Sequence, residues 1–154
     1  MTDHSSFEDR RKMAQELKEY LADTTIVYFK THGFHWNVEG QNFYSLHLMF
    51  EKFYEELWNS MDEIAERIRA LGEKVPPSFA ELLKDATIKE AETPPTASIM
   101  ILSLRDDYVQ LAKRAHNIGS LADEQKDRVT TDMMTEKANF LEKATWMLQS
   151  TTTD

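Results

Sequence analysis

Residues 43–72, with the sequence FYSLHLMFEKFYEELWNSMDEIAERIRALG, decide the fold class of this chain. Apolar side chains recur in this stretch every three or four residues, which is the spacing of one face of a helix. Asn42 precedes the stretch as a candidate N-cap, and Gly72 is a typical helix stop. We therefore expect one long amphipathic helix whose apolar face belongs to a helical core. That face comprises Phe43, Leu46, Phe50, Phe53, Leu57, Met61, Ile64 and Ile68.

Another long helix is expected before this stretch, from about Ser6 to about Trp36. Its start is indicated by Ser5 and Glu8, which have the S-x-x-E spacing of a capping box. Apolar and aromatic residues then follow at helical spacing. Residues 37–40 include an asparagine and a glycine, and they predict a turn between the two helices.

The second half of the chain predicts a long crossover and two more helices. Residues 73–95 hold all four prolines, yet a cluster of apolar residues predicts a short helix inside this segment. The third long helix is expected from about Thr96 to just before Gly119, and the fourth after Asp123. Two short connections and one long crossover are the connectivity of a ferritin-like four-helix bundle, so the predicted fold class is all-α. The apolar cluster comprises Phe79, Leu82 and Leu83.

The composition narrows both the architecture and the chemistry. The chain has 154 residues, of which 41% are hydrophobic and only four are glycine, so we expect one helical domain over residues 1–154. It contains no cysteine. Disulfides, thiolate nucleophiles and cysteine-bound zinc or iron–sulfur centres are therefore excluded, and any metal must be bound by histidine and carboxylates.

The charge sets expectations about partners and location. A formal net charge of −9 opposes non-specific attraction to nucleic acids or anionic membranes and favours cations. No stretch approaches the roughly 20 apolar residues of a membrane span, and the first residues lack the order of a signal peptide. We expect a soluble, cytoplasmic protein without a membrane partner.

Four potential metal ligands in residues 43–72 are placed symmetrically about the midpoint between residues 56 and 57. His47 and Glu51 form one i, i+4 pair, and Asp62 and Glu66 form a second. Glu51 and Asp62 lie about 16 Å apart along a helix, so one ion cannot be bound by all four residues. An antiparallel second copy of the helix would bring His47 to Glu66 of the partner subunit, and Glu51 to Asp62 of the partner subunit. The pattern therefore predicts two metal sites at a dimer interface.

Two less specific interpretations of these carboxylates remain open. Acidic residues on a long helix most often form its solvated face. They can also be paired with arginines across an interface, and Arg67 and Arg69 are close enough in sequence. Symmetric placement is expected when a two-fold axis builds a site, and it is not expected of a solvated face. Histidine and carboxylate ligands without sulfur suit iron, manganese or zinc.

The end of the first helix offers a further ligand. His35 is expected to approach His47 and Glu51, whereas His32 is interpreted as a cap or surface residue. His4 and His116 are interpreted as structural. Trp36 is interpreted mainly as a core residue, with interception of stray oxidising equivalents as the alternative. A cluster of acidic residues near the start of the fourth helix is interpreted as stabilising the N-terminus of that helix by its negative charge. The alternative is that the cluster lines an ion pore where three chains meet. The cluster comprises Asp123, Glu124, Asp127 and Asp132.

The run HWNVEGQNFYSLHLMFEKFYEELWNSMDEIAERIRALG, residues 35–72, closely resembles the signature of the Dps family, the mini-ferritins. The shared elements are His35-Trp36-Asn37, His47, Glu51 and Asp62-x-x-Ala65-Glu66-Arg67, and the resemblance extends over nearly the whole chain. It implies a four-helix bundle with a short helix in the long connection between the second and third helices, assembled as a hollow homo-dodecamer. It also implies ferroxidase centres at dimer interfaces. The implied ligands are His35, His47 and Glu51 of one chain with Asp62 and Glu66 of its mate.

The resemblance also carries an activity. Members of this family oxidise Fe(II), preferring hydrogen peroxide over O2 as the oxidant, and store the Fe(III) product inside the shell, which suppresses hydroxyl-radical chemistry. Zinc or manganese could occupy the same ligands. The chain lacks the Glu-x-x-His pairs of classical ferritins, which disfavours a di-iron centre within one subunit. In the family, the position of Glu51 is often aspartate, so this ligand is direct or water-mediated.

DNA binding is not transferred from the resemblance. Many relatives bind DNA through a lysine-rich N-terminal tail, whereas the first residues here include Asp3, Glu8 and Asp9. The alternatives are a non-enzymatic helical oligomer, either coating DNA or holding a structural metal such as zinc, and a di-manganese protein that consumes peroxide.

Overall fold

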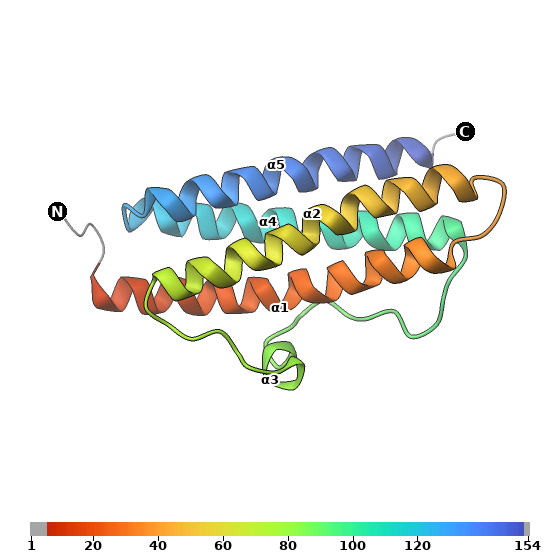
Figure 1. Cartoon of the computed structure of the whole chain (residues 1–154). Helices are drawn as coiled ribbons and strands as arrows, with labels where there is room; N and C mark the ends of the chain where they lie inside the picture. Colours follow the sequence, from red (N-terminus) through yellow and green to blue (C-terminus); the bar gives the residue numbers. More distant parts are fainter. Residues whose placement is uncertain (1–5, 153–154) are drawn as a thin grey trace.

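The computed structural model describes residues 6–152 and places them in a bundle of four long helices with one short helix outside it (Figure 1). The described residues contain no β-strand, which confirms the predicted all-α class. The helices are α1 (Phe7–Asn37), α2 (Phe43–Ala70), α3 (Phe79–Leu83), α4 (Ala97–Glu124) and α5 (Arg128–Thr151).

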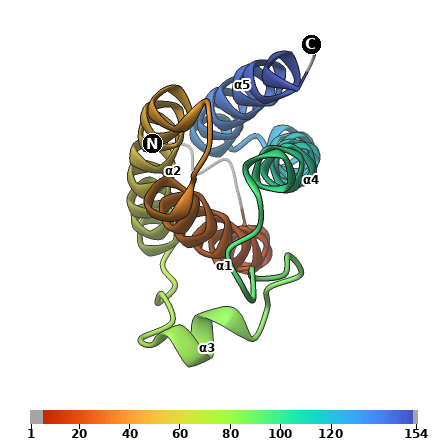
Figure 2. The same ribbon diagram turned by 90° about the vertical axis from the view of Figure 1, so that its right-hand side faces the viewer.

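The four long helices pack as two hairpins. α1 lies against α2, α4 lies against α5, and α1 also packs on α4. Figure 2 looks along the bundle and shows the four long helices around a common core, with α3 outside them on the α1 side. The crossover between α2 and α4 runs the length of the bundle, because α2 and α4 begin at the same end (Figure 1). This arrangement confirms the predicted connectivity and the short helix in the crossover.

The core contains the apolar faces that the sequence pattern predicted. Leu46, Phe50 and Ile64 of α2 are buried, whereas Phe43 at the start of the helix is largely exposed. The Tyr108 hydroxyl of α4 lies 2.9 Å from the Thr31 hydroxyl of α1, so these two buried polar groups satisfy each other inside the core. Burial raises the pKa of the Tyr108 hydroxyl, which therefore stays protonated.

The capping box of α1 lies one residue later than predicted. Ser6 is the N-cap; its hydroxyl accepts from the Asp9 amide at 3.0 Å, and the Ser6 amide donates to the Asp9 carboxylate at 3.3 Å. The predicted pairing of Ser5 with Glu8 is wrong, and Ser5 itself lies outside the described residues. Aspartate fulfils the role that the S-x-x-E pattern gives to glutamate, because either carboxylate can accept from the N-cap amide.

The two ends of α2 differ in how far they match the prediction. Asn42 occupies the N-cap position but makes no side-chain capping hydrogen bond. At the other end, the chain stops at Gly72 as predicted. Gly72 has φ of +98°, a left-handed conformation that favours glycine. The amide of Glu73 then donates to the Ile68 carbonyl, which closes the helix end.

The predicted end of the third helix at Gly119 is wrong, because α4 continues to Glu124. A Cβ added at Gly119 would lie 3.6 Å from the Met134 Cβ of α5, so this residue lies in the packed contact between α4 and α5. Packing against α5 outweighs the low helix propensity of glycine. The chain instead reverses at Lys126, whose φ of 61° is left-handed. α5 consequently begins at Arg128, several residues later than predicted.

Asp127 is the N-cap of α5 and also anchors α2. Its carboxylate accepts from the Thr130 amide at 3.0 Å and from the Arg67 guanidinium at 2.7 Å. Asp127 is buried, so it cannot line a pore in the way proposed for the acidic cluster. The other three members of the cluster, Asp123, Glu124 and Asp132, are exposed.

We expect Asp127→Ala to lower the free energy of unfolding by about 3 kcal/mol, because it removes a helix cap and leaves the Arg67 guanidinium without its partner. Urea unfolding followed by circular dichroism measures this change. Asp132→Ala is the matched control, since Asp132 is an exposed acid in the first turns of the same helix, and its expected effect is below about 0.5 kcal/mol. Equal losses in the two variants would show that helix-terminal charge alone is responsible.

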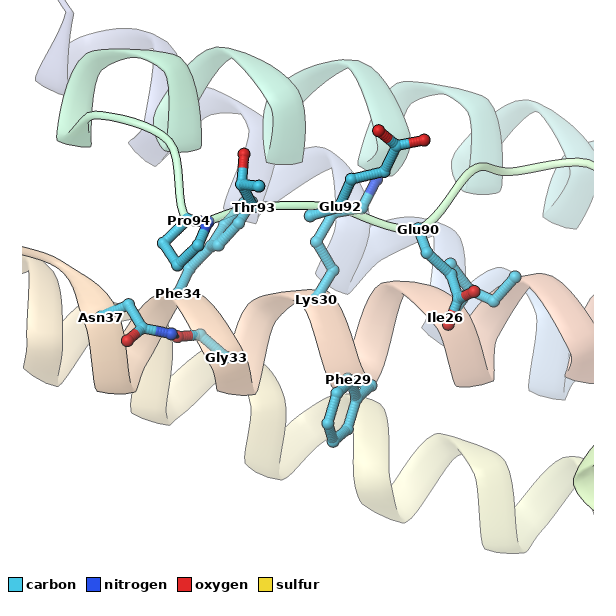
Figure 3. A pocket seen from close by; sticks show the side chains of 11 residues that line it. Ile26, Phe29, Lys30, Gly33, Phe34, Asn37, Glu90, Glu92, Thr93 and Pro94 are labelled. Atoms are coloured by element: carbon cyan, nitrogen blue, oxygen red, sulfur yellow. The ribbon is translucent and has the colours of Figure 1, made fainter.

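The crossover lies over the outer face of α1. A pocket of about 170 Å³ separates part of α1 from residues 90–94 of the crossover (Figure 3). Its floor includes Ile26 and Phe34, and its rim includes Glu90 and Pro94. None of the predicted metal ligands lines this pocket.

Among the described helices, none combines the length and the apolar composition that crossing a lipid bilayer requires.

Candidate metal centre

His35 and His47 form a reciprocal pair at the junction of α1 and α2. The His35 Nδ1 lies 2.7 Å from the His47 carbonyl oxygen, and the His47 Nδ1 lies 2.8 Å from the His35 carbonyl oxygen. The two rings are stacked with centroids 3.8 Å apart. Because a carbonyl oxygen only accepts, each Nδ1 must carry a proton. In the neutral rings the lone pair is then on Nε2, which is the form that binds a metal.

These hydrogen bonds orient the two rings before any ligand arrives. His35 is buried, with 6% of its surface exposed, and the carbonyl groups that hold both rings belong to the helix backbone. Glu51 is half-buried and lies one helical turn after His47, on the same face of α2. The structure therefore brings His35 next to His47 as predicted, with Glu51 one turn away on α2.

Asp62 and Glu66 lie farther along α2 and are exposed. Within residues 6–152, no three His, Cys, Asp or Glu side chains are grouped closely enough to hold a metal ion. A single chain thus presents the predicted ligands as two separate sets.

The arginines considered as alternative partners of Asp62 and Glu66 are engaged elsewhere in the chain. Arg67 donates to Asp127 and to the Thr130 hydroxyl. Arg69 donates to the Glu73 carbonyl oxygen at 2.9 Å. Within one subunit, these arginines therefore do not pair with Asp62 or Glu66, and their pairing across an interface stays a prediction.

His32 was interpreted from the sequence as a cap or surface residue, and this interpretation is wrong. Its ring is half-buried between two aromatic rings, with centroid distances of 3.8 Å to Tyr54 and 4.1 Å to Trp36. Its Nδ1 lies 2.9 Å from the Tyr28 hydroxyl. Burial, together with the neighbouring His35, lowers the pKa of His32, so its neutral form is favoured.

Tyr54 links this aromatic cluster to the candidate ligands. Its ring stacks on His32 and makes an edge contact with His35 at a centroid distance of 5.1 Å. Burial, and then the charge of Glu51, raises the pKa of the Tyr54 hydroxyl. Sequence reasoning missed Tyr28, His32 and Tyr54. The signal was helical spacing, since Tyr28 and His32 are four residues apart and Tyr54 follows Glu51 by three.

Large aromatic side chains are uncovered next to the candidate ligands. Trp36 is 56% exposed, so its interpretation as a core residue is wrong, and Trp58 is 58% exposed. Trp58 and Asp62 both line a surface hollow of about 330 Å³, which also includes Leu82 of α3. Exposed apolar surface of this kind, bordered by polar groups, is typical of a contact surface.

His116 pairs with Glu142 of α5 across the surface, at 2.7 Å from Nε2 to the carboxylate oxygen. The two residues are far apart in sequence, so helical spacing could not reveal this pair. It adds no third ligand, which agrees with a structural role.

Comparison with known proteins identifies the family. Residues 14–154 match the family model described as ferritin-like domain. The chain is 37% identical over 134 residues to the DNA protection during starvation protein of Brevibacillus brevis, covering 87% of this chain and 90% of the relative. This chain belongs to the Dps family. The chain is also similar to general stress protein 20U of Bacillus subtilis, with 37% identity over 139 residues, covering 90% of this chain and 96% of that one.

Solved Dps structures have the same fold. The Dps protein of Vibrio cholerae O1 superposes with a TM-score of 0.91 at 34% identity, covering 95% of this chain and 92% of that one. It is described as a member of a broad superfamily of ferritin-like diiron-carboxylate proteins. The Dps protein of Staphylococcus aureus superposes with a TM-score of 0.89 at 34% identity, covering 94% and 97% of the two chains. The ferritin-like fold expected from the resemblance is thereby confirmed.

Proposed function

We propose that this Dps chain is a ferroxidase and iron-storage protein that works as a homo-oligomer. Its substrate is Fe(II), which binds between His35, His47 and Glu51 of one subunit and Asp62 and Glu66 of the partner subunit. The observation that carries this proposal is the reciprocal hydrogen bonding of His35 and His47, which puts the proton of each neutral ring on Nδ1 and its lone pair on Nε2, the form that binds a metal.

Sharing between subunits follows from the two separate ligand sets. Both sets lie on α2, and a two-fold axis near the middle of this helix would place each set beside the complementary set of the partner subunit. The same contact would cover Trp58 and Trp36, which are exposed in the isolated chain. Twelve subunits in a hollow shell, as the family resemblance implies, would contain six such two-fold interfaces.

The proposed chemistry divides the work between the ligand types. Two Fe(II) ions each give one electron to hydrogen peroxide, the O–O bond breaks, and two protons complete two water molecules. A concerted two-electron reduction of this kind releases no hydroxyl radical. Carboxylates offset the added positive charge of Fe(III), and the histidines, held by backbone carbonyls, fix the position of the ion without adding negative charge. Fe(III) then moves into the shell, and the site is free for further Fe(II).

The test is stopped-flow oxidation of Fe(II) by the assembled protein, with hydrogen peroxide and with O2 in separate experiments. We expect faster oxidation with peroxide, consumption of one peroxide for two Fe(II), and co-elution of the Fe(III) product with the protein on gel filtration. Oxidation no faster than in buffer would contradict the proposal. Metal analysis of the purified protein, followed by the same assay with Mn(II), distinguishes iron from manganese as the substrate. Bound zinc that blocks Fe(II) oxidation would favour the non-enzymatic alternative, in which the metal is structural.

Attachment to DNA is a separate question, since the name of the Brevibacillus brevis relative refers to DNA protection. We expect no shift of linear DNA in a gel at low salt, because the formal net charge of −9 per chain repels phosphate. The control is the same mixture with millimolar Mg²⁺, which can bridge two anionic surfaces. A shift without Mg²⁺, together with absence of iron uptake, would favour the DNA-coating alternative.

A further inference from the structure

The crossover is tied to α1 by the buried carboxylate of Asp23. Asp23 Oδ1 accepts from the Thr87 amide at 2.7 Å and from the Ile88 amide at 2.9 Å, and Oδ2 accepts from the Thr87 hydroxyl at 2.8 Å. Only 4% of Asp23 is exposed, and Ile88 is also buried. One side chain in the middle of α1 thus holds two consecutive residues of a long connection.

A buried carboxylate is an unfavourable way to hold a loop if stability is the only requirement, because burying its charge costs free energy. Burying a charge costs free energy unless its oxygen atoms are fully hydrogen-bonded. No ion pair among the described residues includes Asp23, so three neutral donors from the crossover offset the cost of burial. An apolar contact could hold a loop against a helix without this cost, whereas three directed hydrogen bonds fix its position along α1.

The bonded segment directly follows α3, which lies beside the Asp62 half of the candidate site. Leu82 of α3 lines the hollow that contains Asp62 and Trp58. Leu21 and Thr25, which flank Asp23 by two residues on either side in α1, line the same hollow. The hydrogen bonds of Asp23 and this hollow therefore lie at the same level along α1 but on opposite faces of the helix, because residues two positions apart are rotated by about 200°.

Beyond the bonded segment, residues 90–94 and the facing side chains of α1 together line the pocket shown in Figure 3. Further support at the bonded segment itself is one longer hydrogen bond, from Gln110 to the Thr87 hydroxyl at 3.4 Å. Arg11 of α1 also makes an ion pair with Glu73 at the start of the crossover, at 3.8 Å, so the shorter Asp23 hydrogen bonds are the main polar constraint near the middle of the crossover.

We propose that Asp23 is a positioning residue for the shared metal site. By holding Thr87 and Ile88, it keeps Leu82 as a wall of the hollow around Asp62, and so fixes the surface that the partner subunit contacts when it completes the site. This inference rests on the proposed shared site. It predicts that weakening the Asp23 hydrogen bonds lowers metal affinity, although Asp23 is not a ligand.

The test compares Asp23→Ala with Asp23→Asn in the full-length assembled protein. Zn(II) affinity measured by calorimetry is the first readout, and the Fe(II) concentration at half-maximal oxidation rate is the second. We expect Asp23→Ala to weaken Zn(II) binding and raise the half-saturating Fe(II) concentration by about 10-fold, as is typical for groups that position ligands. Asp23→Asn is expected to stay within about twofold of wild type, because its Oδ1 can still accept from both amides.

Hydrogen exchange reports on the mechanism independently of any metal. Asp23→Ala is expected to accelerate exchange of the Thr87 and Ile88 amides while the amides of α2 stay protected. If Asp23→Ala does not fold, Thr87→Val removes only the hydroxyl bond, and its expected effect on Zn(II) affinity is about threefold in the same direction.

Asp107→Ala is the control for general destabilisation. It leaves buried Lys30 without its 2.8 Å partner, and Asp107 does not line the hollow, so Zn(II) affinity should be unchanged. Wild-type affinity in Asp23→Ala despite fast exchange at Thr87 would overturn the positioning role. Equal losses in Asp107→Ala and Asp23→Ala would also overturn it. The two proposals can fail separately. If the wild-type protein does not oxidise Fe(II), the proposed function is contradicted. If Asp23→Ala nevertheless weakens Zn(II) binding, the positioning role is supported.

Discussion

A chain carrying Asp62→Ala and Glu66→Ala is expected to lose peroxide-dependent Fe(II) oxidation by about 100-fold or more, because two of the five proposed ligands disappear from every site. The histidine half of the site remains intact in this variant, since His35 and His47 are held by each other's backbone carbonyls. Residual binding of Fe(II) by two histidines and one carboxylate is expected to be weak. The added positive charge of Fe(III) would also no longer be offset by the carboxylates of Asp62 and Glu66. The initial rate in stopped-flow absorbance measures the loss.

The matched control is Glu90→Ala combined with Glu92→Ala. These residues are exposed in the crossover, the charge change is identical, and neither is a proposed ligand or lies near the proposed two-fold axis. We expect oxidation rates within about twofold of wild type, because removing exposed charges changes local Fe(II) concentration only modestly. Unchanged rates in the Asp62 and Glu66 variant would contradict the assigned site, and equal losses in both double variants would indicate a general effect of acidic charge.

Mixed particles made from His47→Ala chains and Glu66→Ala chains are expected to regain activity that neither variant has alone. Each two-fold dimer contains two sites, and each site takes His47 from one subunit and Glu66 from the other. In a mixed dimer, one site carries both lesions and the other carries none. With random pairing, half of the dimers are mixed, so about a quarter of all sites should be intact.

The measurement uses differently tagged chains that are refolded together and purified through both tags. The matched control is a mixture of His47→Ala with Glu51→Ala chains. Both lesions then fall in the same half of the site, so every site of a mixed dimer stays damaged and no activity should return. Absence of recovery in well-assembled particles of the first mixture would mean that the site is not shared. Recovery in both mixtures would mean that His47 or Glu51 is dispensable.

Several local features were predictable because they depend on residues close together in one helix. The buried face of α2 followed from apolar spacing, and Gly72 ended that helix in the left-handed conformation that its lack of a side chain permits. The short helix α3 was also recognisable inside the proline-rich crossover. The end of α4 was predicted wrongly because the deciding contact came from another helix, Met134 of α5 beside Gly119, whereas the error at the start of α1 was local, one residue in the choice of capping serine.

The same distinction applies to the candidate site. His47, Glu51, Asp62 and Glu66 were recognisable because their spacing lies within one helix. The surroundings of His32 were recognisable only in part: Tyr28 and Trp36 lie at helical spacing from it, whereas Tyr54, whose ring stacks on it, belongs to the other helix of the hairpin. Asp127 looked like one of four similar acids, and only its burial against Arg67 separates it from the others.

The amino-acid sequence by itself determined the helical class, the order and approximate length of the helices, and the ligand types available for a metal. These properties arise from the 3.6-residue period of the helix and from side-chain chemistry, which are local. The tertiary structure decided which nitrogen of His35 and His47 carries the proton, and that Asp23 holds the crossover beside Asp62. Both depend on the distance and direction between atoms of different elements, which packing sets and local spacing does not.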